Sequence, residues 1–126
     1  MYLQRLQARD YDMALAGQSL GYNLDTYSYW HSTQATSNGL NLSNYRSFGA
    51  DQIIEKIRAT FDQAEKDKYL KQLAQVIADD VPAVFLYRPQ YTLATDNKVQ
   101  QGISLSNLAF PSDRFAAIAQ WCVICQ

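Results

Sequence analysis

The sequence lacks the features that define several classes of protein. Two cysteines are too few for a disulfide-rich scaffold, and one histidine restricts both metal ligation and base-activated nucleophiles. No apolar run approaches the roughly 18 residues that span a bilayer, and the N-terminal MYLQRLQARD lacks the apolar segment expected of a secretory signal. With 11 basic and 12 acidic side chains, the net charge of −1 provides no strong field to attract nucleic acid, so no such partner is predicted.

What the 126 residues do contain is apolar and aromatic side chains. Hydrophobic residues make up 48%, enough for the core of one domain, and nine tyrosines help bring the aromatic fraction to 13%. Several of these aromatic residues lie close together between positions 22 and 30. They indicate either an aromatic-rich core or a binding surface, because Tyr and Trp combine a large contact area with a polar group.

Two tandem amphipathic helices are the clearest local prediction, over residues 50–61 and 63–79. Ser47 precedes the first as an N-cap, and Asp62 precedes the second in the pattern of a capping box. Pro82 is expected to forbid continuation of the second helix. The apolar stripes consist of Ile54, Ile57 and Phe61 in the first helix and of Tyr69, Leu70, Leu73, Ala74 and Ile77 in the second.

Four short segments are predicted to be β-strands, namely residues 11–16, 83–87, 91–95 and 121–124. The first alternates apolar with other side chains, and the second is an unbroken apolar run, as in a strand buried on both faces. A short helix is expected over 26–31, capped by Asp25 or Thr26, and a helical turn within 112–120. Residues 32–47 are expected to form a long polar loop. Strands combined with helices predict an α/β fold class.

The few chemistry-bearing residues do not predict an enzyme, a metal site or a cofactor. Cys122 and Cys125 have the CxxC spacing of zinc and dithiol sites, but zinc needs about four ligands and His31 is the other soft candidate. A redox dithiol favours a helix N-terminus, whereas this pair lies in an apolar run and is expected to pack as small hydrophobic residues. His31 is expected to form structural hydrogen bonds. Asn41 begins a glycosylation sequon, a match frequent by chance.

An ordered series of short motifs runs along most of the chain. It comprises D-Y-D-x-A-L, a loop that begins with glycine, D-T-Y-S-Y-W-H-S, N-G-L-N-x-S-N-Y, D-x-A-E-K-x-K-Y, D-D-V-P-A-V-F-L-Y-R-P, S-D-R-F and a final Trp. From about residue 9 to Trp121, this series resembles the C-terminal part of the family 5 extracytoplasmic solute-binding proteins. These are the oligopeptide- and dipeptide-binding components of ABC importers.

The resemblance implies part of a two-lobed fold of the type II periplasmic-binding-protein kind, in which two α/β lobes close over a ligand. Residues 1–92 would be the C-terminal portion of the second lobe, and residues 93–126 would form the hinge crossing and the return to the first lobe. The larger, N-terminal part of such a protein lies outside this sequence. The implied parent is extracytoplasmic, in the periplasm or at the cell surface, and its partners are a peptide or other small solute and ABC permease subunits.

By the same resemblance, the loop after the first strand lines the ligand cleft. Gly17 matches the family's glycine, whereas Gln18 stands where a Trp is often found. Gly21 stands where peptide binders often carry the Asp that pairs with the peptide amine, so that contact is not available from this position. Asp25 is an alternative partner for the peptide amine, although capping of the following turn explains this residue better. The candidate ligand-binding residues are Gly17, Gln18, Ser19, Gly21, Tyr22 and Asp25.

Two other hypotheses stay open at this point. One is a stand-alone small α/β domain that binds a partner protein through its aromatic loop, and the other is a redox protein that uses Cys122 and Cys125. On the importer hypothesis, the isolated chain is expected to bind no small peptide tightly, since one wall of a cleft supplies too few contacts. Its apolar residues within 98–126 would lack first-lobe partners, which predicts a dimer or larger oligomer.

Overall fold

The computed structural model describes residues 1–19, 21–22, 25–92, 94, 99–100, 110–116 and 118–123. The chain divides into two compact units, which are described separately. Unit 1 comprises Met1–Gln18 and Leu24–Phe85, and unit 2 comprises Ser19–Asn23 and Leu86–Gln126. Among the described residues, no helix is both long enough and apolar enough to cross a membrane.

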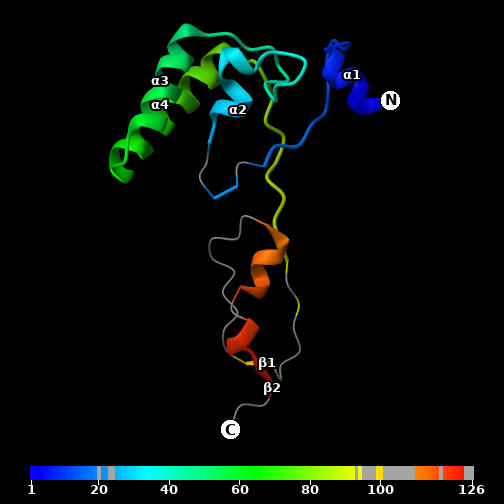
Figure 1. The fold of residues 1–126 in the computed structure, drawn as a ribbon, viewed down its shortest axis with the longest axis vertical. Coiled ribbons are helices and arrows are strands. Elements are labelled where there is room, and N and C mark those ends of the chain that lie inside the picture. Colours follow the sequence, from blue (N-terminus) through cyan, green and yellow to red (C-terminus); the bar gives the residue numbers. More distant parts are fainter. Residues whose placement is uncertain are drawn as a thin grey trace. The chain divides into compact units, whose positions relative to one another are not determined.

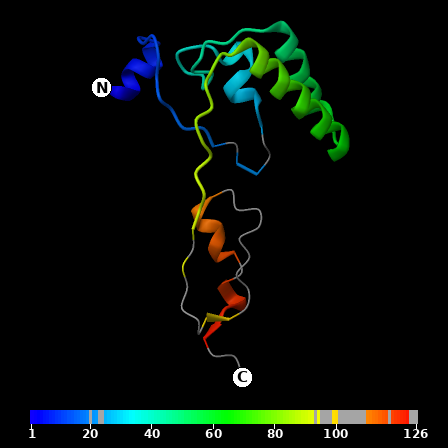
Figure 2. The same ribbon diagram turned by 180° about the vertical axis from the view of Figure 1, so that it is seen from behind.

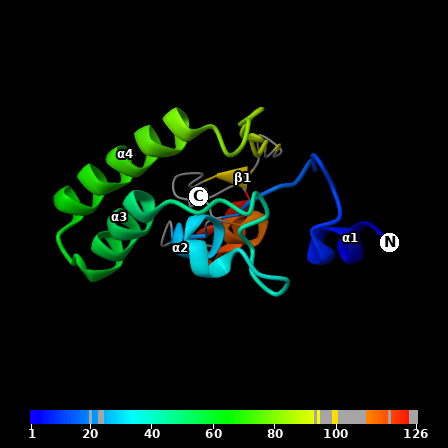
Figure 3. The same ribbon diagram turned by 90° about the horizontal axis from the view of Figure 1, so that it is seen from above.

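Helices α3 (Phe48–Ala59) and α4 (Gln63–Asp80) form a helical hairpin in unit 1, as the sequence predicts. They lie side by side and are joined by a short turn (Figure 3). Ser47 caps α3 by accepting a hydrogen bond from the backbone N–H of Ala50, and Asp62 caps α4 by accepting from two backbone N–H groups. Both predicted N-caps are therefore confirmed, and each satisfies donors that the first helical turn leaves without a partner.

The core of unit 1 lies between this hairpin and helix α2 (Tyr27–Trp30), which lies beside it in both views (Figure 1 and Figure 2). Its buried members are Trp30, Ala50, Ile54, Ile57, Leu73 and Ile77, with Tyr69 and Leu70 partly buried against them. Burial of one large apolar side chain contributes about 1.5–3 kcal/mol. This cluster therefore holds α2 onto the hairpin.

Two members of the predicted stripes are exposed instead. Phe61 is fully exposed because α3 has ended before it, which leaves its side chain in the turn rather than on the apolar face. Ala74 is exposed because the core covers the side of α4 that carries Leu73 and Ile77, and none of the described elements covers the flank of Ala74. The predicted stripe of α4 is thus wider than the stripe that is buried.

The prediction of an α/β fold with several strands is wrong. Residues 11–16 and 83–87 form no strand, and neither do the described residues of 91–95, of which residues 93 and 95 lie outside the description. The segment 83–87, expected to be buried on both faces, exposes Val84 through Tyr87 to between 65% and 82%. A strand satisfies its backbone only through neighbouring strands, and the described part of the chain supplies none here. The described architecture is helical.

The strands that are described are a single short pair in unit 2. Strand β1 (Val99–Gln100) pairs antiparallel with β2 (Cys122–Val123), in the register Val99 to Val123 and Gln100 to Cys122. Strand β2 falls within the predicted strand 121–124, so that prediction is confirmed in part. A pair this short adds little stability of its own.

Several short helices complete the described structure. Helix α1 (Tyr2–Ala8) was not predicted, whereas the 3₁₀ helices η2 (Pro111–Phe115) and η3 (Ile118–Gln120) confirm the helical turn expected within 112–120. A further 3₁₀ helix, η1 (Ser32–Gln34), interrupts the predicted long loop. The predicted oligomer stays a prediction, since much of the segment on which it rests lies outside the described residues.

Candidate functional site

The six candidate ligand-binding residues are divided between the two units. Gly17, Gln18 and Asp25 belong to unit 1, whereas Ser19, Gly21 and Tyr22 belong to unit 2. The first three residues of the loop, Gly17 to Ser19, are exposed. Asp25 is also exposed, and its Oδ1 accepts a hydrogen bond from the backbone N–H of Tyr27 at 3.0 Å. Asp25 therefore holds the turn that leads into α2, whose N-cap is Thr26, as the expected role in the following turn requires.

In unit 2, the end of this loop packs against a segment far along the chain. The rings of Tyr22 and Phe110 meet edge to face, with centroids 5.8 Å apart and an interplanar angle of 74°. Gly21 has a φ of +61°, a left-handed conformation that glycine adopts without strain. A Cβ at Gly21 would lie 3.9 Å from the Phe110 ring, which is an ordinary contact distance, so the backbone conformation and not a lack of space favours glycine here.

Asp113 joins the same group of residues. Its carboxylate accepts a hydrogen bond from the Tyr22 hydroxyl and so raises the pKa of Tyr22, to which desolvation and charge repulsion also contribute. Its Oδ2 accepts a second hydrogen bond from the backbone N–H of Phe110 at 2.7 Å. We call Gly21, Tyr22, Phe110 and Asp113 the Tyr22 cluster. Phe110 and Asp113 were not predicted as partners of this loop, because no local sequence pattern links them to it.

His31, the single histidine, is a structural residue of unit 1. It is 6% exposed, and its Nδ1 accepts a hydrogen bond from the backbone N–H of Thr33 at 3.2 Å, which caps η1. The ring of Tyr27 stacks on it at 4.3 Å, and its Nε2 lies 3.7 Å from Oε1 of Glu55. Ser32 donates its hydroxyl hydrogen bond to Asp51 and not to His31. Ser32, His31 and Asp51 therefore do not form a catalytic triad, and the expected structural role of His31 is supported.

Asn41 is fully buried and uses both ends of its amide. Its Nδ2 donates to the carbonyls of His31 and Tyr45, at 3.1 and 2.8 Å, and its Oδ1 accepts from the N–H of Tyr45 and the hydroxyl of Ser43. Every hydrogen-bonding position of the amide is thereby occupied. A glycan cannot be attached to Asn41 in the folded chain, so the sequon is a chance match.

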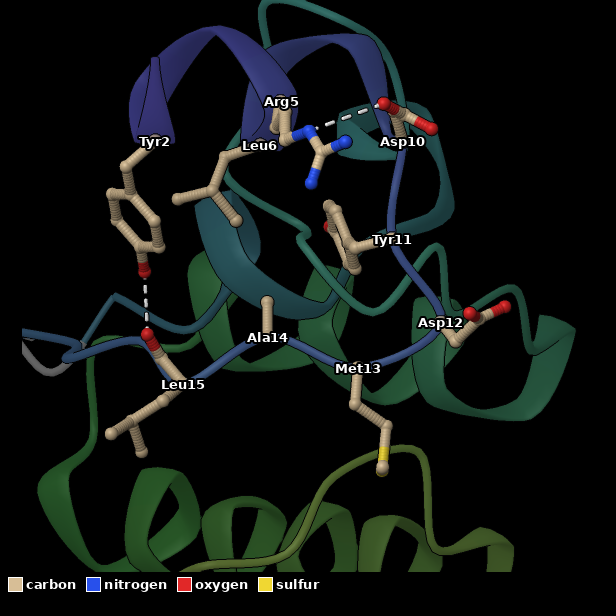
Figure 4. Close-up of a pocket in the computed structure, with 9 residues that line it drawn as sticks. All are labelled: Tyr2, Arg5, Leu6, Asp10, Tyr11, Asp12, Met13, Ala14 and Leu15. Carbon is tan, nitrogen blue, oxygen red and sulfur yellow. Dashed lines mark hydrogen bonds and ion pairs between the residues drawn. The ribbon is translucent and has the colours of Figure 1, made fainter.

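A hollow of about 520 Å³ lies beside α1 (Figure 4). Arg5 Nε and an Asp10 carboxylate oxygen pair across it at 3.4 Å, and the Tyr2 hydroxyl donates to the carbonyl of Leu15. The remaining lining residues are Leu6, Tyr11, Asp12, Met13 and Ala14. The ion pair is largely exposed, so it contributes little stability. This hollow was not predicted from the sequence, because helix α1 was not predicted.

The described residues contain no group of three or more His, Cys, Asp or Glu side chains arranged to hold a metal ion. The pair Cys122 and Cys125 cannot be assessed as a dithiol, because Cys125 lies outside the described residues. The redox hypothesis and the expected packing of the two cysteines as small hydrophobic residues therefore both stay untested.

Comparison with known proteins finds similarity to peptide-binding proteins. The chain is 32% identical over 91 residues to the oligopeptide-binding protein AppA of Bacillus subtilis (strain 168), which covers 72% of this chain and 17% of AppA. It is 27% identical over 99 residues to the probable D,D-dipeptide-binding periplasmic protein DdpA of Escherichia coli (strain K12), covering 76% of this chain and 19% of DdpA.

A third relative is the uncharacterized lipoprotein Rv2585c of Mycobacterium tuberculosis (strain ATCC 25618 / H37Rv), 36% identical over 84 residues, or 67% of this chain and 14% of that protein. The chain thus spans less than a fifth of the length of these relatives. No protein-family model and no solved structure matches it. The matches support the predicted relationship to solute-binding transport proteins, which are not enzymes.

Proposed function

We propose that this chain is the C-terminal part of the substrate-binding component of an ABC importer, with a peptide or related small solute as its ligand. The observation that carries this proposal is the similarity to two peptide-binding proteins over 72% and 76% of the chain. The ordered motifs from residue 9 to Trp121 support the C-terminal placement. Relatives described as periplasmic and as lipoproteins support an extracytoplasmic parent.

The mechanism that follows is capture of the ligand by closure of two lobes. Residues 1–92 belong to the second lobe, and residues 93–126 cross the hinge and return to the first. The ligand contacts both lobes only in the closed state, so it shifts the equilibrium toward closure. The loop from Gly17 to Asp25 lines the cleft, and its exposed side chains are accessible to a ligand. The permease subunits of the importer recognise the closed form.

A chimera tests this function. In Bacillus subtilis AppA, the segment that matches this chain is replaced by the corresponding segment of this chain, and calorimetry measures the binding of a mixed oligopeptide library. We expect affinity within about tenfold of that of AppA, a difference of about 1.4 kcal/mol. Replacement of Gln18, Ser19 or Tyr22 by Ala should weaken binding and leave the melting temperature nearly unchanged, with the largest thermal shift at Tyr22, which contacts Phe110. Gln52→Ala on α3 is the matched control.

A chimera that melts cooperatively and binds no peptide would contradict the proposed function. Unchanged affinity in all three loop variants would contradict the placement of this loop in the cleft, while leaving the transport function intact. The isolated chain is the negative control, because it should show no micromolar binding on its own.

A further inference from the structure

The Asn-Gly pair formed by Asn38 and Gly39 occurs once in the chain and belongs to the loop that follows η1. Asparagine is a chemically labile side chain, and it deamidates most readily before glycine, which has no side chain to hinder the reaction. Asn38 is exposed, so its amide is accessible to water. The pair is therefore a candidate site of covalent modification.

Deamidation at this pair begins at the backbone nitrogen of Gly39. The nitrogen gives its proton to solvent and attacks Cγ of Asn38, so that a bond forms between these two atoms. The side-chain amide takes a proton from solvent and leaves as ammonia. Water then opens the cyclic imide to aspartate or to isoaspartate, and isoaspartate adds one methylene to the backbone. The reaction thus requires a free Gly39 N–H and room for the backbone to rotate.

The folded chain restricts both requirements. The Gly39 N–H donates a hydrogen bond to the carbonyl of Thr36 at 3.0 Å, which closes a turn around Asn38. Gly39 also lies tightly against η1, since a Cβ at this position would be 1.9 Å from the carbonyl oxygen of Gln34. Rotation at Gly39, or an added methylene beside it, would therefore require the loop to move away from Gln34.

The guanidinium group of Arg9 fixes the same turn. Its Nη2 donates to the carbonyl of Thr36 at 2.8 Å and to the carbonyl of Gly39 at 3.0 Å, so one charged group holds both ends of the turn. Hydrogen bonds from a charged donor are stronger than those between neutral groups. Tyr11 extends this attachment, because its hydroxyl accepts from Nη1 of Arg9 at 3.4 Å and donates to the carbonyl of Leu42. We call Arg9 and its two acceptor carbonyls the Arg9 clamp.

We propose that Asn38 is a site of spontaneous deamidation and that the Arg9 clamp controls its rate in the folded chain. Release of the clamp allows Gly39 to rotate, and the reaction then converts the neutral Asn38 into an acid. The clamp therefore links the chemical lifetime of this loop to the attachment of the N-terminal segment. This proposal does not depend on the proposed transport function.

Incubation of the full 126-residue chain at mildly alkaline pH tests the proposal. Peptide mapping by mass spectrometry, with an isoaspartate assay, measures the reaction at position 38, and a synthetic peptide of residues 34–42 is the unfolded reference. The folded chain should deamidate about tenfold more slowly than the peptide, because the two charge-assisted hydrogen bonds must be released first. Arg9→Gln should raise the rate toward that of the peptide. The matched control Arg5→Gln, at a largely exposed side chain of α1, should retain the native rate.

Deamidation of the folded native chain at the rate of the peptide would overturn the proposal. This comparison uses the unaltered chain, so it stands even if Arg9→Gln disturbs α1. If Arg9→Gln keeps the native circular dichroism spectrum and reacts no faster than the native chain, control by the clamp is refuted. An isoaspartate signal that persists in Asn38→Ala would place the modification at another asparagine and would also overturn the proposal.

Discussion

Helix α4 and the segment 83–87 that follows it differ in how far they bury their apolar side chains. The helix buries Leu73 and Ile77 to 2% and 6% exposure, whereas the segment leaves Val84 through Tyr87 at least 65% exposed. Phe85 touches the core through Trp30, with ring centroids 5.9 Å apart, and is still 69% exposed. A helix satisfies its backbone hydrogen bonds internally and needs one surface to cover its apolar face. A strand that is buried on both faces needs neighbouring strands for its backbone hydrogen bonds and a cover for each face.

Substitution of matched leucines gives the largest expected effect. Leu73→Ala should lower the free energy of unfolding by about 2–5 kcal/mol, because it leaves a cavity between α3 and α4. Leu86→Ala should change it by less than about 0.5 kcal/mol, because Leu86 is exposed. Urea unfolding followed by far-UV circular dichroism measures both. Comparable losses for the two variants would show that segment 83–87 is packed after all.

Loss of Asn41 should have the next largest effect. This side chain hydrogen-bonds to the backbone of a loop that belongs to no sheet. Asn41→Ala removes the partners of one buried carbonyl, one part-buried carbonyl and one part-buried N–H, so we expect a loss of about 2–3 kcal/mol. The exposed Asn38→Ala is the control and should be nearly neutral. Thermal unfolding of the two variants distinguishes a buried network from a solvated loop.

At the boundary between α4 and segment 83–87, one substitution is expected to raise the free energy of unfolding instead of lowering it. Val81 ends α4 with a φ of +48°, a left-handed conformation that is strained for a β-branched residue. Val81→Gly should raise the free energy of unfolding by about 1 kcal/mol, since Val81 is exposed and loses little packing. Ala74→Gly, at an exposed position inside α4, should lower it by about 1 kcal/mol. Destabilisation by both variants would refute the strain at Val81.

The smallest expected effect depends on pH. Burial raises the pKa of Tyr45, and its hydrogen bond to Asp80 in the last turn of α4 contributes in the same direction. The folded chain therefore holds the Tyr45 proton more tightly than the unfolded chain does. This stability is present below the unfolded pKa of about 10 and is lost as the pH rises through the folded value.

Tyr45→Phe removes this dependence. The difference in unfolding free energy between the native chain and Tyr45→Phe should be up to about 1 kcal/mol at neutral pH and should shrink above about pH 10. Urea titrations at several pH values up to 11 measure the difference, so that the other tyrosines cancel. A difference that stays constant with pH would show that Tyr45 does not titrate differently in the two states.

Parts of the candidate site were predictable and parts were not. The role of Asp25 in the turn before α2 follows from its position two residues before a short helix, and the structural role of His31 follows from the absence of a nearby nucleophile motif. The contacts of Tyr22 with Phe110 and Asp113 were not predictable, because no periodicity connects residues so far apart. The φ of +61° at Gly21 suits the glycine found there, but the ring that packs against it comes from a distant segment.

The sequence by itself determined the elements whose energetics are local. Helices α3 and α4 and their caps at Ser47 and Asp62 follow from apolar spacing, capping oxygens and Pro82, since each residue contacts others within one turn. Only the tertiary structure decided that Ala74 is exposed and that segment 83–87 is not a strand. These outcomes depend on which surfaces other parts of the chain cover, and a strand or a buried face exists only where such a partner is present.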